Sequence, residues 1–147
     1  IPTDLSFELA RRLASTEAEG ATHTGDHMDS VSEALTLLTA AGLLVLRDRG
    51  GEAEYEFVSP RTRELVAATL AEDEKRRLHD IAAAYFESRL GARPDFISPA
   101  ATHALRGSDP DRGIRLGLAA AAQAERLFAY DPAAAFAAGV LEFLDIL

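Results

Sequence analysis

The chain lacks several residue types that ordinarily carry chemistry. It has no cysteine and no tryptophan, and its only lysine is Lys75. Without cysteine, no disulfide, thiolate metal site or thiol nucleophile can form. No charge-free apolar run reaches the roughly 18 residues of a membrane span. We therefore expect a cytoplasmic protein with no membrane partner and no dependence on thiol chemistry.

Aromatic residues are also scarce, at 7% of the 147 residues, whereas 48% of the chain is hydrophobic. The core must then be built largely from leucine and alanine, which favour helices. This length suffices for one ordinary domain or for two small ones.

Positive charge is in short supply, and the deficit is concentrated near the start of the chain. The formal net charge is −9, of which residues 1–60 contribute −7, with eleven acids against four arginines. Residues 61–147 contribute the remaining −2. Because an acidic surface repels phosphate backbones and anionic lipids, we expect no nucleic-acid partner.

Proline marks four predicted helix starts. Each proline follows a residue able to cap a helix: Ser59-Pro60, Ser98-Pro99, Asp109-Pro110 and Asp131-Pro132. A capping side chain accepts from an unpaired N–H, and proline at the next position has none to leave unpaired. The pattern predicts helices at about 60–70, 98–106, 110–127 and 132–147, with another at 73–90.

The first 60 residues predict two helices and a β-hairpin. Leu5, Leu9 and Leu13 lie at helical spacing, and residues 28–41 form a second amphipathic segment that ends at Gly42. Residues 43–46 and 54–58 read as strands, the latter with Tyr55 and Phe57 on one side and glutamates on the other. The order helix, helix, hairpin, helix is that of a winged-helix unit.

Small residues crowd the later predicted helices. Gly113, Gly117 and runs of alanine at 119–122 and 133–138 would let helix backbones approach closely. We therefore predict a mainly α protein with a winged-helix domain at 1–70, including a two-stranded β-hairpin. TPR-like antiparallel helical hairpins would follow at 71–147.

Two segments resemble a known family. The segments "MDSVSEALTLLTAAGLLVL" and "YEFVSPRTRELVAATLAEDEKRRLHDIAAAYFESR" look like the region after the ATPase core of STAND-class signal-transduction ATPases. This class includes MalT-type transcriptional activators and ATPase-coupled Ser/Thr kinases. The rest, "ATHALRGSDPDRGIRLGLAAAAQAERLFAYDPAAAFAAGVLEFLDIL", is similar to their TPR-like hairpins.

The resemblance implies a non-catalytic regulatory or protein-interaction segment of a longer chain. No G-x-x-x-x-G-K-[ST] loop is present, so ATP or ADP is expected only in an upstream domain and no cofactor in this segment. The implied partners are the adjacent ATPase domain, downstream helical repeats and a further protein. Ser59-Pro60 replaces the family's His-Asp after the second strand, so the histidine that senses phosphate in relatives has no counterpart here.

The start of the predicted helix at 60–70 is a candidate anion site. Arg61 and Arg63 lie in its first turn, where free N–H groups, two guanidinium groups and the Ser59 hydroxyl, which can donate one hydrogen bond, could bind a nucleotide phosphate. The alternative is that Ser59 caps the helix while the arginines are solvated or paired with Glu64.

The last predicted helix carries a candidate protein-interaction face. The face would meet the next helix of a longer chain or drive self-association in isolation. Its members are apolar and share one side of that helix: Phe136, Val140, Leu141, Phe143, Leu144 and Leu147.

Other polar residues have local explanations. Glu72–Arg76 and Asp73–Arg77 are spaced as helix ion pairs. His79 and His103 fall within helical patterns and are expected to serve packing or capping. We identify no catalytic residue and no metal ligand set.

A DNA-binding winged-helix regulator is the alternative function. Its recognition helix would expose residues that include neither arginine nor lysine, which argues against contacts to phosphates and bases. These residues are Asp29, Ser30, Ser32, Glu33, Thr36 and Thr39.

Overall fold

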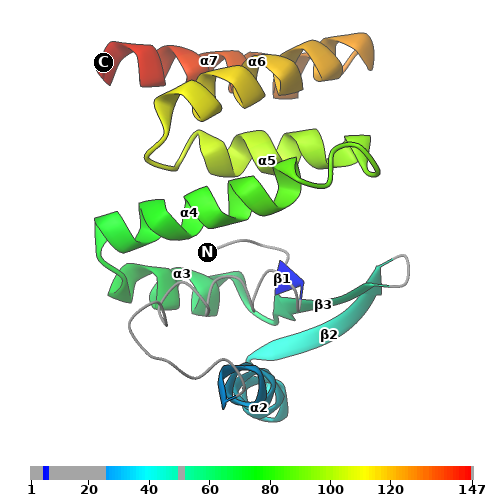
Figure 1. The fold of residues 1–147 in the computed structure, drawn as a ribbon, viewed down its shortest axis with the longest axis vertical. Helices are drawn as coiled ribbons and strands as arrows, with labels where there is room; N and C mark the ends of the chain where they lie inside the picture. The colour runs from blue at the N-terminus through cyan, green and yellow to red at the C-terminus, as the bar shows by residue number, and fades with distance from the viewer. Residues whose placement is uncertain (1–4, 7–25, 50–51, 147) are drawn as a thin grey trace. The chain divides into compact units, whose positions relative to one another are not determined.

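The computed structural model describes residues 5–6, 26–49 and 52–146 (Figure 1). The fold is mainly helical with a β-hairpin, as the sequence predicts. The chain divides into two compact units, Ile1–Ala71 and Glu72–Leu147. The sequence-based boundary lies between residues 70 and 71.

The first unit contains helix α2, Asp26–Ala40, and the predicted glycine terminates it. Gly42 has a φ of 70°, a left-handed conformation that glycine adopts without a steric cost. The amide of Leu43 donates to the carbonyl of Leu38 at 3.0 Å, so the chain turns directly into the sheet.

The hairpin consists of β2, Leu44–Arg49, and β3, Glu52–Phe57, in antiparallel pairing. A third strand, β1 at Leu5–Ser6, pairs with the other edge of β3, giving the order β1-β3-β2. The predicted helix through Leu5, Leu9 and Leu13 is therefore wrong at Leu5, because strand pairing overrides its helical spacing. Leu9 and Leu13 lie outside the described residues.

A small apolar cluster joins α2 to the hairpin. Leu35 and Leu44 are buried, and Val31, Tyr55 and Phe57 pack against them. The predicted alternation along β3 is confirmed, since Tyr55 and Phe57 share this face. Polar residues also pair across the hairpin, where the Arg47 Nε donates to the Glu56 carboxylate at 3.2 Å.

Helix α3, Pro60–Thr69, follows the hairpin at the predicted proline. The structure buries none of its residues, and Leu65 is 63% exposed.

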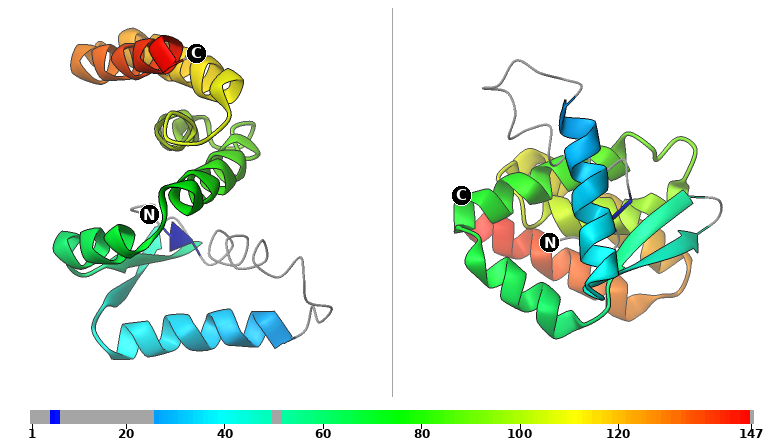
Figure 2. Two further views of the ribbon diagram at one scale, coloured as in Figure 1. Left: turned by 90° about the vertical axis from the view of Figure 1, so that its left-hand side faces the viewer. Right: turned by 90° about the horizontal axis from the view of Figure 1, so that it is seen from below.

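The second unit is a stack of helices. Figures 1 and 2 show α4, α5, α6 and α7 following one another, each packed on the next. A short 3-10 turn, η1, precedes α5. The bounds are Glu72–Glu87 for α4, Pro94–Phe96 for η1, Ile97–Ala104 for α5, Pro110–Arg126 for α6 and Tyr130–Ile146 for α7.

Two of the four proline-marked starts are displaced. Helices α3 and α6 begin at Pro60 and Pro110 as predicted, and the Asp109 carboxylate accepts from the Arg112 amide at 3.0 Å. Helices α5 and α7 begin two residues before Pro99 and Pro132. The first turn of a helix leaves its N–H groups unpaired, so proline is tolerated at any position in that turn.

Glycines let the helices of this unit approach closely. A Cβ atom on Gly117 would lie 2.5 Å from the Val140 Cγ2, and one on Gly139 would lie 3.0 Å from the Leu105 Cδ1. The small-residue pattern therefore marks the contacts of α6 and α7, as the sequence suggests.

Two ion pairs join α4 to α6. The Glu87 carboxylate, 26% exposed, accepts from the Arg112 Nε at 3.1 Å and from the Arg115 guanidinium at 2.5 Å. Bonds between charged groups at this degree of burial are stronger than those at a fully exposed surface.

Candidate functional site

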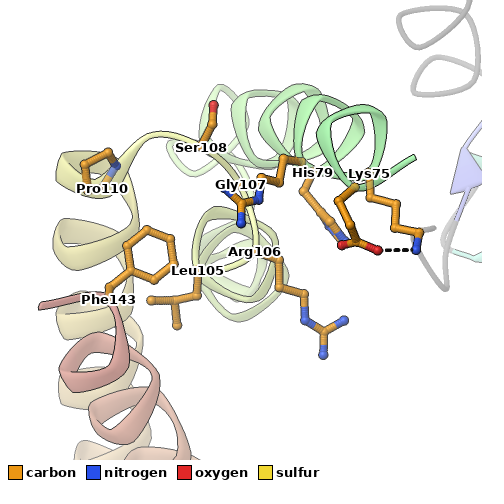
Figure 3. A pocket seen from close by; sticks show the side chains of 10 residues that line it. Lys75, His79, Leu105, Arg106, Gly107, Ser108, Pro110 and Phe143 are labelled. Atoms are coloured by element: carbon orange, nitrogen blue, oxygen red, sulfur yellow. Dashed lines mark hydrogen bonds and ion pairs between the residues drawn. The ribbon is translucent and has the colours of Figure 1, made fainter. Parts of the chain in front are cut away.

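A cleft of about 460 Å³ opens on the second unit (Figure 3). Leu105, Pro110 and Phe143 form its apolar side. Its polar and charged residues come from α4 and from the turn after α5: Glu72, Lys75, Arg76, His79, Arg106 and Ser108. Lys75 and His79 lie across from Phe143 in Figure 3.

The turn between α5 and α6 is fixed by a carboxylate from α4. Asp80 accepts from the Ser108 amide at 3.0 and 3.1 Å and from the Ser108 hydroxyl at 2.5 Å. A Cβ atom on Gly107 would collide with the Asp80 carboxylate. Glycine at 107 therefore lets the turn approach α4, which brings Arg106 and Ser108 to the rim of the cleft.

A histidine pair lies behind this rim. The Nδ1 atoms of His79 and His103 are 2.8 Å apart, and His103 is only 7% exposed. The His103 ring stacks on Phe86, with ring centroids 5.7 Å apart and planes at 6°. Phe86 in turn meets Phe96 edge-on. The pair thus joins α4 to α5 through the aromatic part of the core.

Both histidines are held neutral. Burial lowers the pKa of His79 to about 4, and Arg106 acts in the same direction. Burial and the neighbouring His79 lower the pKa of His103 to about 3. A neutral imidazole carries one N–H, so only one of the two facing Nδ1 atoms can donate. The ring that accepts must then carry its proton on Nε2, which couples the tautomers of the two residues.

Lys75, Arg76 and Arg106 supply the positive charge around the cleft. Lys75 donates to Glu72 at 2.6 Å, and this bond holds the pKa of Glu72 below its ordinary value. The predicted Glu72–Arg76 pair is therefore replaced by one with Lys75. Arg76 and Arg106 are exposed, and neither guanidinium has a hydrogen bond or ion pair within the described residues.

The start of α3 contradicts one part of the alternative interpretation, in which the Ser59 side chain caps the helix. The Ser59 side chain makes no capping hydrogen bond, although its carbonyl accepts from the Arg63 amide at 3.2 Å. Arg61 is exposed and Arg63 half-buried, and neither pairs with Glu64 in the described part of the chain. Among the described residues no further group converges on this turn, so the phosphate contact stays a prediction.

The residues of the predicted interaction face on the last helix differ in exposure. Val140 is 4% exposed and packs against Gly117, so it is not available to a partner. Phe136 and Phe143 are half-buried and line clefts of the second unit. Leu141 and Leu144 are 61% and 48% exposed. Leu147 lies outside the described residues.

The turn between α6 and α7 is a second exposed apolar region. Leu127, Phe128 and Tyr130 are 69%, 77% and 65% exposed. Phe128 has a φ of 57°, a left-handed conformation that costs a residue other than glycine roughly 1–2 kcal/mol. Its ring meets Tyr130 edge-on, with centroids 6.5 Å apart.

The described surface of α2 gives no support to DNA contacts. Ser32, Glu33 and Thr36 are exposed, Thr39 is half-buried, and both threonine hydroxyls donate to carbonyls of their own helix. The side chains of Asp29 and Ser30 lie outside the description.

Sequence reasoning did not identify the cleft. His79 and His103 were expected to pack or cap, and both pack, with ring centroids 5.1 Å apart, but their direct contact was not predicted. They are 24 residues apart, on successive helices, and no local pattern indicates that they meet.

Comparisons of the chain with family models, with curated proteins and with solved structures gave no match. Among the described residues, no three histidine, aspartate or glutamate side chains gather as metal ligands do. None of the described helices has the length and apolar character needed to cross a lipid bilayer.

Proposed function

We propose that this chain is a non-catalytic regulatory and protein-interaction segment of a larger cytoplasmic signal-transduction ATPase. In this proposal the first unit is a winged helix that contacts the ATPase domain, and the second is a TPR-like stack that relays nucleotide state to a partner. ATP or ADP would bind only in the ATPase domain.

One observation carries the proposal. Helices α4 to α7 pack in chain order, and the last pair keeps Leu118, Leu141 and Leu144 exposed. Helical stacks grow by covering such surfaces with a further hairpin, because one supersecondary unit cannot bury its apolar face alone. Further helical repeats, or a second copy of the chain in isolation, would cover them here.

Two further features support an interaction role. The exposed aromatic turn at Phe128 and Tyr130 offers the residue types that are enriched in protein interfaces. The acidic first unit suits contact with protein better than contact with a polyanion.

Hydrogen–deuterium exchange on the full-length protein tests the proposal. With a non-hydrolysable ATP analogue in place of ADP, we expect amide exchange to change by about tenfold in α2–β3 and in α7, since regulatory elements open locally at low free energy. Leu141→Glu with Leu144→Glu should abolish the change in α7. Ala119→Glu with Ala122→Glu, at exposed positions of α6 with the same spacing, is the charge-matched control. A full-length protein that binds no nucleotide would refute the assignment.

A further inference from the structure

The cleft beside His79 combines features that the proposed function does not use. It pairs an apolar side, formed by Leu105, Pro110 and Phe143, with the exposed guanidinium groups of Arg76 and Arg106, which make no hydrogen bond or ion pair within the described residues. In a chain of net charge −9, such a pair of arginines is an unusual local excess. Lys75 is already neutralised by Glu72 at 2.6 Å.

We propose that this cleft binds a small organic anion, with a carboxylate or phosphate headgroup on Arg76 and Arg106 and an apolar body against Phe143. This inference stands independently of the proposed function.

The size of the cleft favours a small molecule over a protein segment. Its volume of about 460 Å³ lies within the range of ligand pockets, roughly 300–1,000 Å³. Such pockets are mostly apolar, with a few polar groups that fix orientation, and this cleft has that composition.

The charge of the headgroup follows from the donors. A guanidinium group offers N–H donors only, in a planar arrangement that matches carboxylate and phosphate oxygens. The two carboxylates of α4 at or beside the cleft already have donors, since Glu72 accepts from Lys75 at 2.6 Å and Asp80 accepts three hydrogen bonds from Ser108. A cationic ligand would be repelled by the two arginines, and a neutral acceptor would form weaker hydrogen bonds with them than a carboxylate or phosphate does.

His79 would report on the bound anion. Its Nδ1 faces His103, and its Nε2 has no hydrogen-bond partner among the described residues. An anion near Nε2 favours the tautomer that carries a proton there, and His103 must then donate from its own Nδ1. Binding therefore selects one of the two coupled tautomers.

Titrations followed by ¹H–¹⁵N spectra test the proposal on the whole chain. Phenyl phosphate and benzoate are the probes. Two controls are inorganic phosphate, which lacks the apolar body, and benzylamine, which carries the opposite charge. We expect at least one aromatic anion to shift the Gly107 and Ser108 amides and the His79 ring nitrogens saturably. Inorganic phosphate should bind about tenfold more weakly or not at all, since the apolar body adds buried area.

The variant Arg76→Gln with Arg106→Gln should lower affinity for the aromatic anions by about tenfold or more, because charge-assisted bonds are lost. Both side chains are exposed, so the variant should fold, which its spectrum would verify. Arg126→Gln, at an exposed arginine of α6 away from the cleft, is the matched control. Binding of phenyl phosphate alone would identify a phosphate headgroup, and binding of both probes a general organic anion.

Three results would overturn the proposal. They are unchanged affinity in the double variant, equal binding of benzylamine, and no binding of either aromatic anion.

Discussion

The described parts of the two units are packed by different means. In Ile1–Ala71, Leu35 of α2 and Leu44 of the hairpin form the buried cluster, and α3 buries no residue. In Glu72–Leu147, buried alanines and glycines of successive helices meet around a few large side chains, among them Tyr85 and Leu116. Small residues bring backbones close together, so each helix is held along its length by its neighbours.

This difference indicates which unit is suited to local opening and which is suited to keep a fixed geometry. A unit with few buried apolar groups opens at low free energy, and such regions commonly serve as regulated elements. A stack fixed by close backbone contact is suited to hold a cleft or a binding face in constant geometry.

Removing one buried leucine from each unit tests this contrast most strongly. Leu116→Ala and Leu35→Ala, at positions 1% and 5% exposed, should each cost about 2–5 kcal/mol through lost burial and a residual cavity. Hydrogen exchange should then rise in α5–α7 for the first and in α2–β3 for the second. The exposed Leu118→Ala and Leu37→Ala are controls expected to stay within about 0.5 kcal/mol. Simultaneous loosening of both units by either core variant would break the contrast.

Gly117→Ala examines the close packing of the second unit. The added methyl would meet the stiff, branched Val140, so we expect a loss of about 1–3 kcal/mol in unfolding free energy, although alanine is the better helix former. Gly91→Ala, where the methyl meets open space, should be neutral or slightly stabilising. Chemical denaturation measures both.

A double-mutant cycle sharpens that test. In a Val140→Ala background, which makes room for the methyl, Gly117→Ala should cost much less than it does alone. Equal costs in the two backgrounds would show that the contact does not limit packing.

At neutral pH the smallest effect is that of the histidine pair, because it appears only in acid. Unfolded histidines gain a proton near pH 6.5, whereas folded His79 and His103 do so near 4 and 3. Between these values the unfolded state binds more protons, so the stability of the second unit should fall as pH drops from about 6.5 toward 4, and remain level above 6.5. His103→Leu should flatten this slope in exchange measurements across α4–α5. If the variant shows the same dependence of stability on pH as the parent protein, the histidine pair is not its cause.

Much of the fold could be predicted from local signals. The proline at 60 and the Asp109-Pro110 pair locate the starts of α3 and α6, and Gly42 marks the end of α2. The displaced starts of α5 and α7 were missed, because a first-turn proline is compatible with more than one start. The strand at Leu5 was missed because its partner, Tyr55, lies far along the chain.

The candidate site was less predictable than the fold. Ser59, Arg61 and Arg63 were selected for their place at a helix start, and nothing else in the described structure converges there. The face of the last helix was partly misassigned, since Val140 packs inward on α6. Periodicity indicates which residues share a side of a helix, but not which part of that side is covered.

The sequence by itself determined the helical bias, the acidic balance, the starts of α3 and α6 and the small residues at the helix contacts. These properties depend on composition and on neighbours within a turn or two. The tertiary structure alone decided the pairing of β1 with β3, the burial of Val140 and the meeting of His79 with His103 beside the cleft that Arg76 and Arg106 line. These outcomes join residues far apart in the chain, and their energies depend on packing and desolvation that local sequence patterns do not record.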